Sequence, residues 1–160
     1  MENNDCNTQV TQEYREAVTA LADNQEDRRF LNDSRAHAKL LAELMIGRAT
    51  EDTETCIYSG SLGKGCFAEA LSSSEGTIRV LLDSKEGLDI TNALDELVRN
   101  RLKVKIAELP HSNHFFISGN SFRYEKDHND ATAIANFNEP ETVKKLKALF
   151  DSMWSAAVAA

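Results

Sequence analysis

Two histidines that could carry chemistry, His111 and His114, lie three residues apart directly before the apolar run 115–117. Near neutral pH an imidazole can act as a nucleophile, as a general acid or base, or as a metal ligand. Pro110 precedes this stretch and the apolar run has the pattern of a buried strand, so we expect the polar residues at the entry to that strand. The stretch is therefore the first candidate for a functional site.

A metal centre is one interpretation of His111 and His114, with His128 nearby in the sequence. Imidazoles are the commonest ligands for transition metals, but this spacing fits no strong zinc pattern. If residues 115–117 form a strand, the two histidines need not converge. We expect no metal and no cofactor, which leaves either a site built on His111 or histidines with only structural or surface roles.

A glycine-rich turn is the second candidate for a binding site, because it follows an apolar strand pattern and precedes a helical one. Strand, glycine turn and helix is the geometry that directs backbone N–H groups at a phosphate. The spacings of the Walker and dinucleotide motifs are both absent, so the turn can equally be a plain connection. The candidate ligand-binding residues here are Ser59, Gly60, Ser61 and Lys64.

The elements that must position these residues alternate between strand and helix in the first part of the chain. Strand patterns cover 56–60, 77–83 and 103–107, and a helical pattern follows each of the first two. Successive strand–helix–strand units with right-handed crossovers place such strands parallel in one sheet. Functional sites of parallel sheets gather at the carboxyl ends of the strands, and His111 lies just beyond one of those ends.

Short strands close together follow Pro110, at 115–117, 121–124 and 132–135, and the sequence 118–120 (SGN) is typical of a hairpin turn. These strands make the predicted sheet mixed. The predicted fold class is therefore α/β, with a mixed, partly parallel sheet flanked by helices.

Three helices complete the prediction. The first starts between residues 8 and 11, the second is capped by Asp33 or Ser34, and the last begins at Pro140 with an apolar stripe along one side. We expect residues 155–160 to be frayed.

The order of these elements resembles half of a phospholipase D-like fold, the superfamily named for the motif His-x-Lys-x4-Asp. If Ser118 and Gly119 take the place of the family's Asp-Gly turn, His111 matches the motif histidine, Asn113 the lysine and Ser118 the aspartate. The family often has an Asn and an acidic residue later in the chain, where Asn129 and Asp130 stand.

The resemblance covers roughly residues 33–154. It implies a phospholipase D-like domain at 33–160, preceded at 1–32 by a polar tail and an extra N-terminal helix, in one globular unit overall. The implied catalytic positions are His111, Asn113, Ser118 and Asp130, and the implied ligand contacts include Asn129.

The chain departs from the family motif at two of its three defining positions. Family members use one motif histidine to attack phosphorus and a second to protonate the leaving group, while the lysine supplies positive charge. Asn113 carries no charge, and Ser118 provides no carboxylate. We therefore expect phosphodiesterase activity to be lost or very slow.

A chain with a single motif implies a homodimer, with the two His111 side chains facing each other across a twofold axis. The favoured function is a nearly inactive accessory or regulatory protein that binds a protein partner or a phosphate-bearing ligand. The alternative is a divergent phosphodiesterase or nuclease that acts as a homodimer through His111 of each subunit, with Arg123 or Lys64 replacing the missing lysine.

The overall charge narrows the choice of partner. With 26 acidic and 18 basic residues the formal net charge is −8, which argues against strong binding to bulk nucleic acid or to anionic membranes. The sequence has no apolar run of about 20 residues and no secretory signal pattern. Three cysteines without a CxxC pair favour a reducing compartment, so we expect a cytoplasmic protein.

Overall fold

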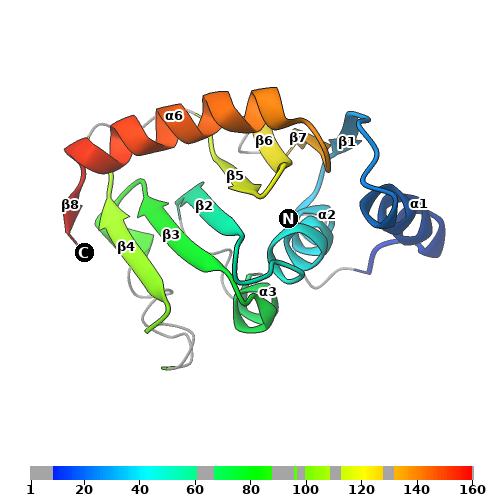
Figure 1. Cartoon of the computed structure of the whole chain (residues 1–160), viewed down its shortest axis with the longest axis horizontal. Coiled ribbons are helices and arrows are strands. Elements are labelled where there is room, and N and C mark those ends of the chain that lie inside the picture. Colours follow the sequence, from blue (N-terminus) through cyan, green and yellow to red (C-terminus); the bar gives the residue numbers. More distant parts are fainter. Residues whose placement is uncertain are drawn as a thin grey trace.

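The computed structural model describes residues 9–60, 67–87, 96, 100–108, 113–127 and 132–159, which form one eight-stranded sheet with helices on both faces (Figure 1). The elements in chain order are α1 (Gln12–Asp23), β1 (Phe30–Asn32), α2 (Arg35–Leu41), the π-helical turn η2 (Ala42–Ile46), β2 (Glu54–Ser59), α3 (Ala68–Ser73), β3 (Thr77–Leu82), the 3-10 turn η4 (Lys85–Gly87), β4 (Leu102–Ile106), β5 (Phe115–Ser118), β6 (Ser121–Asp127), β7 (Thr132–Asn136), α6 (Pro140–Ala156) and β8 (Val158–Ala159). The helix expected near 88–98 lies almost entirely outside the described residues.

The sheet is mixed, as the sequence predicted. Its strand order is β1-β7-β6-β5-β2-β3-β4-β8. Strands β2, β3 and β4 run parallel, and all other neighbouring pairs in the described sheet are antiparallel. Because β5 is antiparallel to β2, the first residue of β5 lies at the same edge of the sheet as the last residue of β2.

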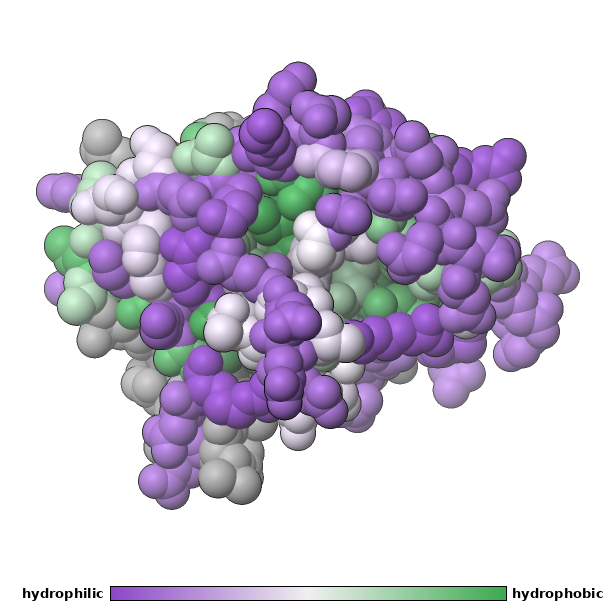
Figure 2. Space-filling view, in the orientation of Figure 1, coloured by the Kyte–Doolittle hydropathy of each residue, from purple (hydrophilic) through white to green (hydrophobic). Residues whose placement is uncertain are grey.

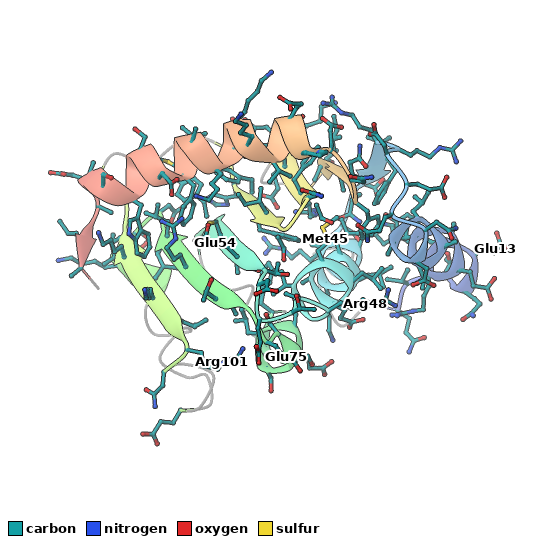
Figure 3. The ribbon with its side chains drawn as sticks, in the orientation of Figure 1. Glu13, Met45, Arg48, Glu54, Glu75 and Arg101 are labelled. Carbon is teal, nitrogen blue, oxygen red and sulfur yellow. The ribbon has the colours of Figure 1, made fainter. Side chains whose placement is uncertain are left out.

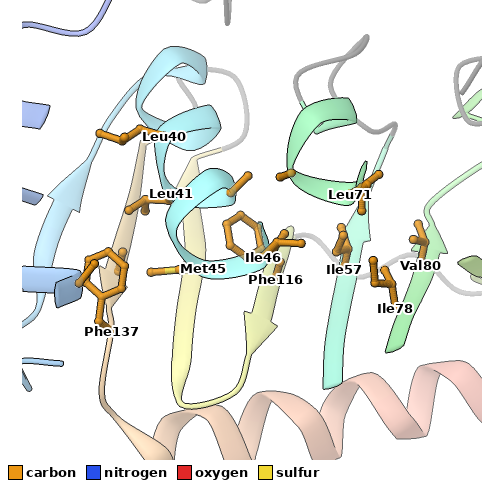
Figure 4. Close-up of a cluster of buried hydrophobic side chains, with 14 of the residues drawn as sticks. Leu40, Leu41, Met45, Ile46, Ile57, Leu71, Ile78, Val80, Phe116 and Phe137 are labelled. Atoms are coloured by element: carbon orange, nitrogen blue, oxygen red, sulfur yellow. The ribbon is translucent and has the colours of Figure 1, made fainter. Parts of the chain in front are cut away.

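Side chains of the central strands alternate between two cores, one on each face of the sheet. Ile57 of β2 and Phe116 of β5 pack under α2, η2 and α3, in what we call the α2/α3 core (Figure 4). Their neighbours Cys56 and Phe115 point to the opposite face, into what we call the α6 core. Strands buried on both faces have nearly continuous apolar sequences, which is why these strands could be predicted.

Helix α6 covers the second face (Figure 1), and three of its side chains, Val143, Leu146 and Phe150, belong to the α6 core. Arg79 of β3 fixes this helix further. Its guanidinium lies 5.0 Å from the centre of the Phe150 ring and donates to Asp151 at 2.8 Å. A cation held against an aromatic face and a carboxylate is well matched to a partly buried position.

The β5–β6 hairpin is confirmed. Ser118 pairs with Ser121, so only Gly119 and Asn120 connect the two strands. Gly119 has a φ of 59°, a conformation that most residues with a Cβ atom adopt only at a cost in free energy.

Two strands at the sheet edges differ from the sequence prediction. The segment 30–32 forms β1 and pairs with β7, whereas no strand was expected there. Residues Val158 and Ala159, expected to be frayed, form β8 and pair with Lys105 and Ile106 of β4. Strands this short take their stability from the neighbouring strand, and their own sequences carry no strand pattern.

The N-terminal helix packs on the rest of the domain. Thr11 caps α1 by accepting a hydrogen bond from the backbone N–H of Tyr14, which places the start of the helix where it was predicted. Val18 and Ala22 are buried in the α2/α3 core. The extra helix therefore shares a core with the residues that follow it.

Glu139, just before α6, joins the start of that helix to Arg29. It accepts a hydrogen bond from Arg29 Nε at 2.8 Å, and further bonds from Thr142 and Asn136. The bonds from Arg29, which contribute most, lower the pKa of Glu139 from 4.5 to about 2. The ionised carboxylate is thus the form that the folded protein stabilises.

Glu139→Gln is expected to lower the free energy of unfolding by about 1 kcal/mol at pH 7, a small value because solvent screens the Arg29 pair. The pKa of Glu139 is lower in the folded than in the unfolded chain, so its contribution is complete above the ordinary value of 4.5 and disappears as the pH falls towards 2. Urea unfolding of both proteins between pH 7 and pH 2.5 measures the difference. A difference that stays constant over this range contradicts the prediction.

No helix in the described part of the chain is long and apolar enough to cross a membrane.

Candidate functional site

Polar side chains gather at the carboxyl edge of the parallel strands, the place where the sequence predicted a site. Ser59 and Gly60 lie at the end of β2, and Asp83 directly follows β3. His114 immediately precedes β5, which begins at this same edge. The described part of the site is therefore built from strand ends, which are held rigidly by the sheet.

His114 lies between two carboxylates. Its Nε2 is 2.9 Å from Asp83 Oδ2, and its Nδ1 is 3.6 Å from Glu125 Oε1. The side chain is only 9% exposed and its ring meets that of Tyr58 edge to face, with centroids 5.2 Å apart. The hydrogen bond between Nε2 and the Asp83 carboxyl group fixes the orientation of the His114 ring. Both ring nitrogens of His114 thus face carboxylates within the described part of the site.

Gly60, which directly follows β2, lies close to this pair. A Cβ atom at position 60 would lie 3.3 Å from Asp83 Oδ2 and 3.5 Å from His114 Cε1. A side chain at this position would require the Asp83 carboxylate to shift by a few tenths of an ångström. The predicted ligand-binding residue Gly60 is thus at the site, and its lack of a side chain has a packing reason there.

Arg123 is directed into the protein. Its Nη1 lies 3.0 Å from Glu125 Oε2, its Nε donates to Asn32 Oδ1 at 2.6 Å, and its side chain is 4% exposed. Burial lowers the pKa of Arg123, while the neighbouring Glu125 raises it. The residue proposed from sequence as a replacement for the family lysine is thus beside the site but directed towards Glu125 and β1.

Asn113, which takes the place of the family lysine in the predicted alignment, connects two strands. Its Nδ2 donates to the backbone oxygen of Glu125 at 2.9 Å, and the backbone N–H of Glu125 donates to the oxygen of His114 at the same distance. These bonds hold the entry to β5 against β6. The Asn113 amide therefore stabilises the local backbone at the entry to β5.

Ser118 lies away from Asn113 and from the described candidate residues at the carboxyl edge. It lies at the far end of β5, about 15 Å along the strand from Asn113. Its Oγ is 2.9 Å from Thr55 Oγ1, and only 4% of Ser118 is exposed. The hydroxyl pair satisfies two buried polar groups between β5 and β2, which is a structural role. Its predicted catalytic role finds no support in this placement.

The remaining sequence-predicted residues cannot be placed. His111, Ser61, Lys64, Asn129 and Asp130 lie outside the described residues, as does His128 of the metal hypothesis. Within the described ranges no group of three or more His, Cys, Asp or Glu side chains could hold a metal ion.

The sequence did not single out Asp83, Glu125 or Asn32 as site residues. For Asp83 there was a signal, because an acidic residue directly follows an apolar strand at the carboxyl edge of a predicted parallel sheet. The sequence around Glu125 and Asn32 carried no such signal. These two residues come near His114 and Arg123 only because their strands, β6 and β1, both pair with β7 in the folded sheet.

Comparisons with known proteins identify the fold. No protein-family model and no curated protein matches the sequence. TrmBL2, an archaeal chromatin protein whose structure shows a novel mode of DNA binding, aligns with 93% of this chain at a TM-score of 0.63 and 15% identity. The alignment covers 62% of the TrmBL2 chain, so this chain spans less than two thirds of that protein.

Two further structures match over nearly their whole lengths. Nuc from Salmonella typhimurium, a phospholipase D family member, is covered to 99%, with 84% of this chain aligned, a TM-score of 0.60 and 11% identity. NucT from Helicobacter pylori is covered to 100%, again with 84% of this chain, a TM-score of 0.57 and 13% identity. The chain therefore has a phospholipase D-like α/β fold. At these identities the similarity concerns the fold, and the degenerate motif stays a prediction.

Proposed function

We propose that this chain is a phospholipase D-like protein with little or no phosphodiesterase activity. It acts by binding a protein partner or a phosphate-bearing ligand at the carboxyl edge of the sheet, as an accessory or regulatory factor. One observation carries this proposal. Asn113 takes the position that the resemblance assigns to the family lysine, and its amide donates a hydrogen bond to the backbone oxygen of Glu125.

The charges around His114 support the same proposal. Phosphodiester cleavage needs positive charge that stabilises the phosphoryl oxygens in the transition state. In the described part of the site two carboxylates, Asp83 and Glu125, face His114, and Arg123 is paired with one of them. These described residues therefore provide little positive charge to stabilise the phosphoryl oxygens in the transition state.

The surface favours a protein partner over bulk nucleic acid. Hydrophilic side chains cover most of the face seen in Figure 2, and the formal net charge is −8. A negatively charged protein loses the counterion-release contribution that drives general binding to DNA or RNA. We also propose that the chain forms a homodimer, because the resemblance implies that two single motifs meet.

Hydrolysis assays test the proposal. The wild-type protein and His111→Ala are compared on bis(p-nitrophenyl) phosphate and on fluorescently labelled single-stranded DNA, in EDTA and with Mg²⁺, Mn²⁺ or Zn²⁺. We expect both proteins to match the buffer blank. Hydrolysis by the wild type that disappears in His111→Ala overturns the proposal in favour of a phosphodiesterase that acts through His111. Light scattering at micromolar concentration, run alongside, refutes the dimer if only the monomer mass is found.

A further inference from the structure

Buried and partly buried polar side chains form a continuous chain of contacts from α1 to His114. Beginning at the site, Glu125 uses its two oxygens differently. Oε1 faces His114 Nδ1 at 3.6 Å, and Oε2 lies 3.0 Å from Arg123 Nη1. Arg123 then donates through Nε to Asn32 Oδ1 at 2.6 Å. A single carboxylate is thus shared between the site histidine and an arginine that is anchored on β1.

The sheet allows this contact because the strand between β6 and β1 carries small side chains. Arg123 pairs with Ala135 of β7, and both Glu125 and Asn32 pair with Ala133. Directly paired residues lie on the same face of a sheet. The two alanines are fully buried, and their short side chains leave room for the guanidinium to reach across β7.

Tyr14 extends the chain to the N-terminal helix. Its hydroxyl accepts a hydrogen bond from Asn32 Nδ2 at 2.8 Å and donates to the backbone oxygen of Leu31 at 3.1 Å. Its ring stacks on that of His37 of α2, with centroids 3.9 Å apart and an interplanar angle of 8°. Burial raises the pKa of Tyr14, so the hydroxyl keeps its proton over the physiological range. The orientation of the Asn32 amide is therefore set from α1.

We propose that the position of α1 controls the candidate site through Tyr14, Asn32 and Arg123, with Arg123 as the positioning residue. Tyr14 orients Asn32, Asn32 orients Arg123, and Arg123 holds the Glu125 carboxylate opposite His114. Anything that displaces α1 changes the field and the hydrogen bonding at His114. The inference describes regulation of the site, and rests on the proposed function in taking this edge as the place where the ligand or partner binds.

Tyr14→Phe tests the coupling because it removes one hydroxyl and keeps the ring that stacks on His37. The matched control is Tyr124→Phe, since Tyr124 belongs to β6 but packs in the α6 core on the opposite face. The readout is the pair of ring-nitrogen chemical shifts of His114 in protein labelled with ¹⁵N-histidine. Glu125→Gln, which alters the carboxylate next to His114, shows that these signals respond to the local change.

We expect Tyr14→Phe to move the His114 ring-nitrogen signals clearly more than Tyr124→Phe does, with both proteins folded. The inference is overturned if Tyr14→Phe and Tyr124→Phe shift the His114 signals equally, or not at all, while Glu125→Gln does shift them. Titration with inorganic phosphate is the second readout, with an expected loss of affinity of about fivefold in Tyr14→Phe. If phosphate binds the wild type and Tyr14→Phe equally well, the coupling fails and the proposed function stands. If the wild type binds no phosphate, the phosphate-ligand form of the proposed function fails, and the His114 shifts alone decide the coupling.

Discussion

Replacing Arg123 with alanine is expected to lower the free energy of unfolding by about 3–5 kcal/mol, the cost of removing one partner from a buried ion pair. The side chain of Arg123 is 4% exposed, and it is paired with Glu125 and hydrogen-bonded to Asn32. Its loss leaves the Glu125 carboxylate without its cation and the Asn32 carbonyl without a donor. Urea unfolding monitored by circular dichroism at pH 7 gives the value.

Arg48→Ala is the matched control. Arg48, which is labelled in Figure 3, forms a 2.7 Å pair with Asp23, and half of its side chain is exposed. Exposed pairs of this kind contribute at most about 1 kcal/mol. The double variant Arg123→Met/Glu125→Met is expected to lose less than Arg123→Ala, since it removes both charges together. A loss below about 1 kcal/mol in Arg123→Ala contradicts the buried ion pair.

Phe150→Ala is expected to cost about 3–5 kcal/mol of stability, the range typical of removing a large side chain from a packed core. Phe150 is fully buried under α6. Its ring stacks near Trp154, with centroids 5.8 Å apart, and also supports the guanidinium of Arg79. The substitution therefore removes apolar burial and a cation–π contact at the same time.

Lys145→Ala provides the control on the same helix, because Lys145 is exposed. Its effect is expected to stay within about 0.5 kcal/mol. Thermal and urea unfolding of the three proteins give the comparison. If Phe150→Ala and Lys145→Ala have equal effects, α6 does not pack on the sheet through Phe150.

These two predictions differ in what the sequence alone could say about them. The apolar stripe of α6, to which Phe150 belongs, follows the helical period and was predicted from the sequence. The strands β2, β3 and β5 were equally predictable, because burial on both faces gives them short continuous apolar runs. The periodic spacing of buried residues is a local property of the chain, so it can be recognised in a single sequence.

The two edge strands, β1 and β8, could not be predicted from local sequence patterns. The sequence of β1 contains Asn32, and β8 consists of Val158 and Ala159 after a run of small residues. Neither segment has enough length to display an alternating pattern. Each becomes a strand because a neighbouring strand, β7 or β4, offers unpaired backbone groups. These unpaired backbone groups are available only once the rest of the sheet has formed.

The sequence by itself determined that the fold is a mixed, partly parallel α/β sheet and that Ser59 lies at the end of its first parallel strand. Strand direction and strand ends follow from local periodicity and from the handedness of crossovers. Only the tertiary structure decided what surrounds His114. Asn32 and Arg123 are 91 residues apart in the chain, and they meet because Ala133 and Ala135 of β7 leave room for the guanidinium. Contacts of this kind depend on strand order and register, which no local pattern encodes.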